Sequence, residues 1–192
     1  MRVEALAGAA LDASLDAVAR LRIAVFRDWP YLYDGDPDYE RRYLEIYTNP
    51  RAIVVGAFEG DRMVGAATGM PLADHANDLG TALAGLVAPL SDIFYCAESV
   101  LLPDYRGQGA GHVFFDRRET HARTLGQTHS AFCAVQRPAG HPARPADYRP
   151  LDDFWHKRGY QPVAGAVAGF SWKDLGQTEE TAKPLQFWMK PL

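Results

Sequence analysis

A glycine-rich turn in the middle of the chain constrains the fold more than any other feature. An apolar run over residues 93–102 leads into Pro103-Asp104-Tyr105-Arg106-Gly107-Gln108-Gly109-Ala110-Gly111, and a helical pattern follows to residue 125. Three glycines remove side chains from a tight strand-to-helix turn, so backbone N–H groups can converge on an anion at the positive end of the helix. The turn therefore predicts either a phosphate-binding cradle or a plain glycine-rich connection.

Two other phosphate-binding motifs do not fit this turn. A P-loop ends in Gly-Lys-Ser/Thr, whereas Gly111 is followed by His112 and Val113. A dinucleotide fingerprint is spaced G-x-G-x-x-G and opens the first strand–helix unit of a chain. Here the spacing is G-x-G-x-G, in the middle of the chain and after an expected hairpin.

The remaining pattern predicts an α/β chain with a mixed sheet. Helices are expected over residues 11–26 with Asp12 as N-cap, over 37–48 after a strong Asp36-Pro37 start, around 79–87, over 111–125 and over 152–158. Strands are expected over residues 3–6, 52–58, 63–70, 93–102, 131–136, 163–172 and 185–189, and residues 137–147 are expected to form a loop. No linker divides the 192 residues, so residues 1–192 are predicted to form one domain.

Charge and composition exclude several classes of protein. The chain has 20 Lys and Arg against 24 Asp and Glu, and this net charge of −4 disfavours nonspecific binding of nucleic acid. No uncharged stretch approaches the ~20 residues that span a bilayer, and Glu4, Asp12 and Asp16 interrupt the region where a signal peptide is apolar. Cys96 and Cys133 lie in apolar runs without clustered Cys or His. We therefore expect a cytoplasmic protein with reduced, buried cysteines and no metal, membrane or nucleic-acid partner.

The glycine-rich turn and a later segment resemble the GNAT superfamily of N-acetyltransferases. Arg106-Gly107-Gln108-Gly109-Ala110-Gly111 is similar to motif A of that family, Arg/Gln-x-x-Gly-x-Gly/Ala. Phe154-Trp155-His156-Lys157-Arg158-Gly159-Tyr160 is similar to the late helix of the family and the start of the strand after it. The resemblance covers roughly residues 12–172 in element order and is sharpest over 94–160. It implies the GNAT fold, a mixed, splayed β-sheet flanked by helices.

The resemblance also implies acetyl-CoA as the acyl donor and an amine, on a small molecule or a peptide, as the acceptor. The amine would attack the thioester directly while both substrates are bound. The pyrophosphate is expected on Arg106, Gly107, Gln108, Gly109, Ala110 and Gly111, and the pantetheine along Val100, Leu101 and Leu102, where the strand of the family carries a bulge. Gln136 stands where the family often has an Asn that contacts the cofactor, and Trp155 on the late helix is a further expected cofactor contact.

Glu98 is the candidate general base. It is a carboxylate in an otherwise apolar strand beside the expected bulge, and a carboxylate shielded from water is the better proton acceptor. The alternative is a structural ion pair with an Arg such as Arg118. The general acid of the family is usually a Tyr, whereas this chain has Trp155, which lacks a transferable proton. Tyr148 and His156 are candidate substitutes; alternatively no protein acid is needed, because CoA thiolate is a fair leaving group.

Two segments are expected to border the acceptor. Residues 31–40 combine acids with Tyr rings, which suits a cationic amine, or they form only a capped helix with a solvated acidic turn. Residues 72–91, with Asp74, His75 and Asp78, are a second candidate wall.

Other functions and assemblies remain open at this stage. Because the family Tyr is absent at Trp155, one alternative is a CoA-binding sensor or interaction domain with little turnover. Another is transfer of a longer acyl chain, or transfer to a hydroxyl group. The apolar residues 185–189 are a candidate shared edge of a homodimer.

Overall fold

Seven strands form one open sheet in the computed structural model, which describes residues 1–75, 78–85 and 87–192. Across the sheet the strands run in the order β1-β2-β3-β4-β5-β7-β6. Their bounds are β1 (Arg2–Leu6), β2 (Ile53–Glu59), β3 (Arg62–Pro71), β4 (Ile93–Leu101), β5 (His129–Val135), β6 (Gln161–Lys173) and β7 (Glu180–Pro191). β4 and β5 pair in parallel, and the other ladders between these strands are antiparallel. The prediction of a mixed sheet is confirmed.

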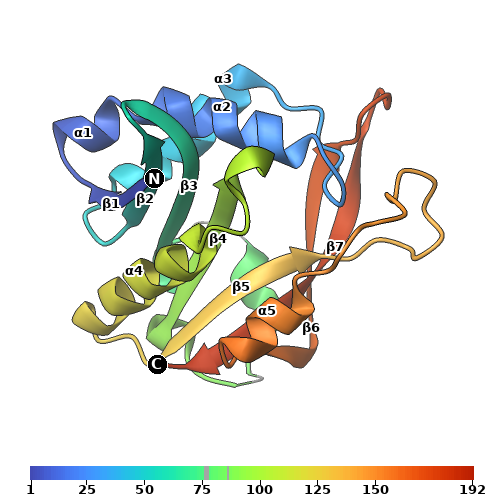
Figure 1. Cartoon of the computed structure of the whole chain (residues 1–192). Helices are drawn as coiled ribbons and strands as arrows, with labels where there is room; N and C mark the ends of the chain where they lie inside the picture. Colours follow the sequence, from blue (N-terminus) through green and yellow to red (C-terminus); the bar gives the residue numbers. More distant parts are fainter. Residues whose placement is uncertain (76–77, 86) are drawn as a thin grey trace.

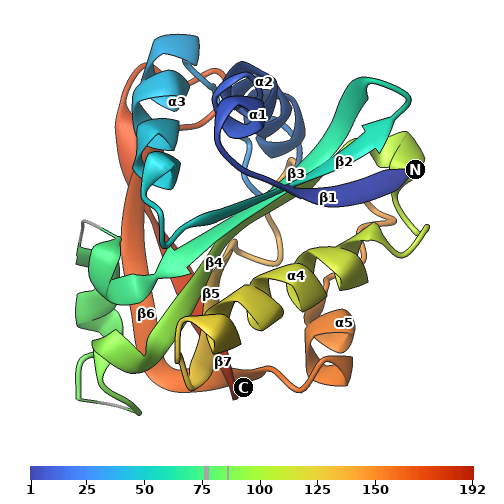
Figure 2. The ribbon, with the colours of Figure 1, turned by 90° about the vertical axis from the view of Figure 1, so that its left-hand side faces the viewer.

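Helices cover both faces of the sheet (Figure 1 and Figure 2). α1 (Ala9–Asp12), α2 (Leu15–Phe26) and α3 (Pro37–Leu44) lie over one face, and α4 (Ala110–Thr124) and α5 (Asp152–Lys157) lie over the other. α2 packs Val18 and Leu21 in a cluster with Val54 of β2, whereas α4 packs Phe114 against Val55. Within the described ranges, no helix is long and apolar enough to cross a membrane.

β4 and β5 separate after a short parallel ladder. Residues 93–95 pair with residues 129–131. Beyond this point β4 continues as the partner of β3, and β5 continues as the partner of β7. Figure 1 shows the two strands diverging. Residues 96–101 of β4 therefore border an opening in the middle of the sheet, which confirms that the sheet is splayed.

A bulge interrupts β4 beside this opening. Ala67 of β3 faces Ser99, whereas Gly69 faces Cys96, so β4 has one extra residue opposite Thr68. Arg118 of α4 is only 1% exposed and fills the irregularity. Its Nη1 donates to the carbonyls of Thr68 at 3.1 Å and Glu98 at 2.9 Å, and its Nη2 donates to Ser99 Oγ at 2.8 Å. The guanidinium thus satisfies acceptors that the bulge removes from the ladder.

The helix predicted over residues 11–26 is divided into α1 and α2. Asp12 ends α1, so its prediction as an N-cap is wrong. Ser14 precedes α2 without a side-chain cap, and its hydroxyl donates to the Ala10 carbonyl at 2.7 Å. A serine that bonds to the preceding turn in this way competes with continued helix. The predicted start of α3 is confirmed, because Asp36 Oδ1 accepts from the Tyr39 N–H at 2.6 Å.

Short 3-10 turns replace some of the expected α-helix. The structure has η1 (Glu45–Thr48), η2 (Leu72–Asp74), η3 (Asp78–Leu83), η4 (Leu90–Asp92) and η5 (Pro103–Tyr105). The helix predicted around residues 79–87 corresponds to η3, and Leu86 lies outside the described residues. Pro89 follows this segment and favours a short turn over a full helix.

Candidate active site

The glycine-rich turn presents a row of backbone amides without protein partners. Gly107 and Gly109 have φ values of 75° and 86°, which L side chains rarely adopt, and a Cβ at either position would point into open space. In the part of the chain that the structure describes, no N–H of residues 107–111 donates to a protein acceptor, whereas Arg106 donates to Pro103. Free amides at the start of a 15-residue helix suit an anion.

Two polar side chains hold the shape of this turn. Arg106 Nε donates to the Leu101 carbonyl at 3.1 Å, and Gln108 Nε2 donates to the Asp104 carbonyl at 3.2 Å. The Arg106 bond ties the turn to the end of β4, and the Gln108 bond ties it to η5. Arg106 and Gln108 therefore support the row of amides through contacts that the sequence alone does not predict.

Alternate amides of β4 face the opening in the sheet. The Leu102 N–H donates to the Val64 carbonyl at 3.0 Å, so Val100 lies in the next hydrogen-bonded pair with β3. This alternation turns the N–H groups of Ser99 and Leu101 away from β3. Of the three residues predicted along the pantetheine, Leu101 offers its amide to the opening, whereas the amides of Val100 and Leu102 are directed to β3. Ser99 was missed because sequence does not show which pairs are hydrogen-bonded.

Gln136 and Trp155 make structural contacts. The Gln136 N–H donates to the Pro184 carbonyl at 2.8 Å and extends the pairing of β5 with β7. The Trp155 rings lie 4.9 Å from those of Phe132 and 5.1 Å from those of Trp188, between centroids. The indole therefore anchors α5 to the sheet. A cofactor contact from either residue stays a prediction.

Glu98 extends from the bulge toward α2 and α3 and is 5% exposed. Its carboxylate lies 2.8 Å from Arg22 Nη1 and accepts hydrogen bonds from Tyr47 at 3.2 Å and Tyr43 at 3.5 Å. Glu98 does pair with an arginine, but the suggested partner was wrong. Arg118 donates to the Glu98 carbonyl from the other side of the sheet and does not reach the carboxylate.

Two buried carboxylates share Arg22. Its Nε donates to Glu40, which is fully buried, while its Nη1 pairs with Glu98. Burial opposes the charge of Arg22, yet its pKa lies above the ordinary value because Glu98, then Tyr43 and Glu40, favour the cation. Burial, followed by the charge of Glu98, raises the pKa of both Tyr43 and Tyr47, so each stays a neutral donor. The cluster thus holds Glu98 in one orientation.

A cavity of about 440 Å³ lies beside Arg22. One wall comes from residues 31–39, and the adjoining wall comes from β6 and the turn after it. The two walls are joined by backbone hydrogen bonds from Asp34 to Lys173 at 2.9 Å and from Leu175 to Leu32 at 2.7 Å. The predicted acceptor segment therefore borders a cavity that contacts the Glu98 cluster through Arg22.

The structure does not place Tyr148 among the contacts of Glu98. Its ring meets Trp29 edge-on at 5.9 Å and lies under Arg144 at 5.4 Å. Burial, and then the charge of Asp152, raises the pKa of Tyr148, which makes it a weaker acid. The other candidate acid, His156, packs against Trp188. An acid role for Tyr148 stays a prediction without a supporting contact.

No described residue of the second predicted wall lines this cavity. Asp74 forms an ion pair with Arg51 at 2.9 Å, and His75 packs edge-on against Tyr95 at 5.1 Å. Burial lowers the pKa of His75 to about 4. Neither Asp74 nor His75 lines the cavity, and the side chain of Asp78 lies outside the described residues.

Both cysteines are buried and free of disulfides. Cys96 Sγ lies 3.4 Å from Ser130 Oγ, and burial raises the pKa of Cys133 to about 12. A thiol with so high a pKa is a poor nucleophile at neutral pH. Among the described residues, no group of three or more His, Cys, Asp or Glu side chains is arranged to hold a metal ion.

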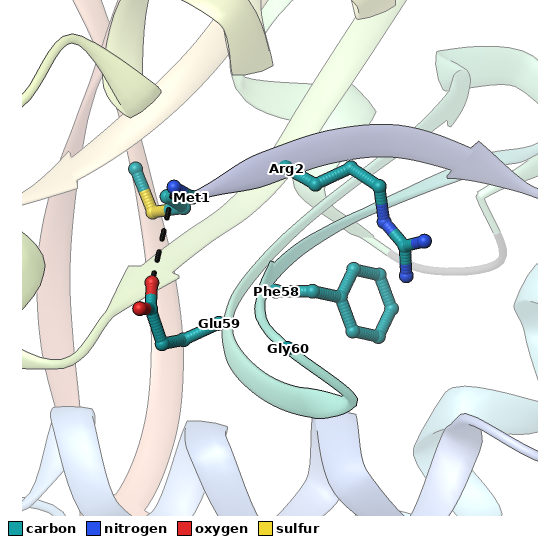
Figure 3. A pocket seen from close by; sticks show the side chains of 5 residues that line it. All are labelled: Met1, Arg2, Phe58, Glu59 and Gly60. Atoms are coloured by element: carbon teal, nitrogen blue, oxygen red, sulfur yellow. Dashed lines mark ion pairs between the residues drawn. The ribbon is translucent and has the colours of Figure 1, made fainter.

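A second cavity of about 460 Å³ lies at the edge of the sheet (Figure 3). It is lined by Met1, by Arg2 at the start of β1, and by Phe58, Glu59 and Gly60 at the β2–β3 turn. The Met1 amino group pairs with Glu59 at 3.8 Å, and Arg2 lies over the Phe58 ring at 5.1 Å. This cavity contains no residue predicted to bind the cofactor or to act in catalysis.

The fold is that of an α/β protein whose sheet opens beside a row of backbone amides without protein partners among the described residues. The model of the acetyltransferase (GNAT) family matches residues 18–146, more than half of the chain. The chain therefore belongs to the GNAT acetyltransferase family. A comparison with curated proteins finds no significant match.

Solved structures share this fold at low sequence identity. The ribosomal-protein-alanine N-acetyltransferase from Brucella melitensis is 14% identical, with a TM-score of 0.64 and 100% of both chains covered. The yncA protein from Salmonella typhimurium, solved with its cofactor acetyl-CoA, is 14% identical, with a TM-score of 0.63; the match covers 100% of this chain and 95% of that chain. An aminoglycoside 6'-N-acetyltransferase complexed with coenzyme A is 16% identical, with a TM-score of 0.60; the match covers 100% of this chain and 97% of that chain. At identities this low, the structural likeness shows a common fold.

Proposed function

We propose that the chain is an acetyl-CoA-dependent N-acetyltransferase that acetylates an amine within a ternary complex. The row of free amides at residues 107–111, beside the opening between β4 and β5, carries this proposal. Family membership and the acetyl-CoA and CoA bound in two similar structures support it. Residues 1–192 act as one domain in this proposal, because the candidate site draws on segments from α2 to β7.

On the donor side, the chain contributes backbone groups. The amides of residues 107–111 bind the pyrophosphate, with Arg106 and Gln108 supporting the turn. The amides of Ser99 and Leu101 bind the pantetheine, and a β4 amide polarises the thioester carbonyl. Gln136 and Trp155 complete the proposed cofactor contacts near the ends of β5 and α5.

On the acceptor side, Glu98 is the proposed general base. An ammonium group must lose one proton before its nitrogen attacks the thioester carbon. The N–C bond then forms while the C–S bond breaks, CoA leaves as a thiolate, and the second amine proton passes to solvent. The thiolate takes its own proton from water, so this step needs no protein acid. If Tyr148 acts as the acid, Tyr148→Phe will lower the rate; if not, turnover will be retained.

One observation favours a second function. Arg22 already neutralises Glu98 in a buried pair, and Trp155 replaces the family Tyr. A CoA-binding sensor with little turnover would have this arrangement. Calorimetry of acetyl-CoA binding, combined with thiol release in the presence of an amine panel, separates the two functions. Binding with turnover supports the transferase, binding without turnover supports the sensor, and absence of binding contradicts both.

Glu98→Gln tests the base directly. Loss of a general base is expected to lower kcat about 100-fold near neutral pH. The difference in kcat between Glu98→Gln and the parent should shrink as pH approaches the pKa of the amine itself, because the amine then loses its proton to solvent. The measurement is kcat/KM as a function of pH.

Glu40→Gln is the matched control for this variant. It removes a carboxylate from the same Arg22 but retains the proposed proton acceptor. This control should lose thermal stability and keep the pH profile of the parent. A Glu98→Gln profile parallel to that of the parent would assign Glu98 a structural role.

A further inference from the structure

Aromatic rings dominate the cavity beside Arg22. Six of its fourteen lining residues are aromatic, namely Phe26, Tyr31, Tyr33, Tyr39, Phe170 and Trp172. Four of them form a continuous wall, with centroid distances of 4.3 Å for Phe26–Tyr31, 5.8 Å for Tyr31–Trp172 and 6.3 Å for Trp172–Phe170. Aromatic faces are apolar and carry partial negative charge, so they bind both planar groups and organic cations.

Arg137 fixes the position of this wall. Its guanidinium binds both carboxylate oxygens of Asp174, at 2.8 and 2.9 Å, and donates to the carbonyls of Pro30 at 2.9 Å and Tyr31 at 2.6 Å. Trp172 Nε1 also donates to the Tyr31 carbonyl, at 3.0 Å. Tyr31 and Trp172 are thus held by partly buried hydrogen bonds, and a ligand that meets a preformed wall loses less free energy to ordering.

The charges around the cavity leave a surplus of acid. Three acids and three bases line it, namely Asp34, Asp36, Glu180, Arg22, Arg42 and Lys173. Arg22 is already neutralised by Glu40 and Glu98, which do not line the cavity, so Asp34, Asp36 and Glu180 face only Arg42 and Lys173 as unneutralised lining bases. This field attracts a cation and disfavours a carboxylate or a phosphate.

We propose that this cavity binds the acceptor, and that the acceptor is a small primary amine with an aromatic body, bound as its ammonium ion. The inference rests on the proposed function. The aromatic body lies against the wall of rings, and the ammonium group binds the lining carboxylates of Asp34, Asp36 and Glu180. A volume of about 440 Å³ suits a small molecule. A short aliphatic diamine has no ring to place against this wall, so it makes weaker contacts there and is disfavoured.

A panel of amines tests the substrate class with the full chain. The probes are 2-phenylethylamine, n-butylamine, 1,4-diaminobutane and a tripeptide with a free N-terminal alanine, and thiol release gives kcat/KM for each. We expect kcat/KM for 2-phenylethylamine to exceed that for n-butylamine by about tenfold, because n-butylamine has no ring to contact the aromatic wall. A diamine or peptide that equals 2-phenylethylamine would overturn the inference.

Phe170→Ala tests the site. The variant should raise KM for 2-phenylethylamine about tenfold and leave KM for acetyl-CoA unchanged. Val167→Ala is the matched control, because Val167 is exposed on the same strand and does not line the cavity. Equal effects of the two substitutions on KM for the amine would contradict the proposed location.

Binding measurements separate failure of this inference from failure of the proposed function. If no amine is acetylated, calorimetry with 2-phenylethylamine in the presence of CoA decides the inference, and absence of binding overturns it. Calorimetry with acetyl-CoA alone shows whether the proposed donor site binds its ligand. Loss of acetyl-CoA binding would overturn the transferase assignment, whatever the amine result.

Discussion

Arg22 is a buried cation at the centre of a cluster of ion pairs. It is bound by two buried carboxylates, Glu40 and Glu98, and its guanidinium lies over the Tyr43 ring at 4.4 Å. Removing one member of a buried ion pair typically costs about 3–5 kcal/mol, because the remaining charge is left unpaired. Here the loss of Arg22 would leave two carboxylates facing each other. Arg22 therefore positions Glu98, and its substitution is a poor test of chemistry.

His75 predicts a pH dependence of stability. Its pKa in the folded chain is about 4, against about 6.5 in an unfolded chain. Between these values the unfolded chain binds a proton that the folded chain does not, so the free energy of unfolding falls as pH decreases. From pH 7.5 to pH 5 this contribution amounts to about 2 kcal/mol.

Denaturant unfolding of the parent and of His75→Leu at both pH values measures this contribution. The parent should lose about 2 kcal/mol more than the variant on acidification. Equal losses in the two proteins would show that His75 is protonated without unfolding.

At the scale of the element, Gly109 leaves open the space in front of the first turn of α4. Its φ of 86° strains any L residue, and an added carboxylate would occupy the space in front of the free amides. Gly109→Asp is therefore expected to abolish acetyl-CoA binding in calorimetry. Gly109→Ala should weaken it less, because it adds strain without charge.

Gly126 supplies the control at the other end of the same helix. It follows α4 with a φ of 78°, and a Cβ at this position would point into open space. Gly126→Ala should lower the melting temperature as much as Gly109→Ala and leave acetyl-CoA binding intact. Equal weakening of binding by both alanine variants would mean that helix stability, and not the cradle, limits binding.

The bulge in β4 depends on one side chain. Arg118→Lys keeps the charge, but an ammonium group cannot match the fork that serves Thr68, Glu98 and Ser99. We expect a loss of about 2–3 kcal/mol in the free energy of unfolding, since buried acceptors lose their donors. KM for acetyl-CoA should rise as well, because the amides of Ser99 and Leu101 adjoin the bulge. Arg117→Lys, at an exposed neighbour on α4, should change neither quantity.

Local signals made the elements predictable, whereas contacts between distant segments were not. The glycine-rich turn, the α3 start at Asp36 and the β2–β3 hairpin each have their signature within a few residues. The break at Ser14 depends on one side-chain hydrogen bond, and the pairing of Glu98 with Arg22 joins residues 76 positions apart. The sequence places Arg137 only in a loop, because its partners come from two distant segments, Pro30-Tyr31 and Asp174.

At the scale of the whole molecule, Arg137 joins the end of β5 to both walls of the cavity. Arg137→Lys should raise KM for the amine several-fold and leave acetyl-CoA binding unchanged, because the donor side does not use these bonds. Amide exchange of Leu175, which donates to Leu32 between the walls, should accelerate in the variant. Arg149→Lys, exposed in the same loop, is the control. Equal rises in KM for both substrates would indicate a global loss of structure instead.

The separation of β4 from β5 has a consequence for the order of binding. Ser99 and Leu101 expose amides that a neighbouring strand would normally cover, so a donor with its own amide groups acts as a surrogate strand and closes the gap. Acetyl-CoA would then bind first and rigidify this part of β4 before the amine binds. Slower hydrogen exchange at Ser99 and Leu101 on addition of acetyl-CoA alone would record that closure, and the kinetics should follow ordered addition with the donor leading.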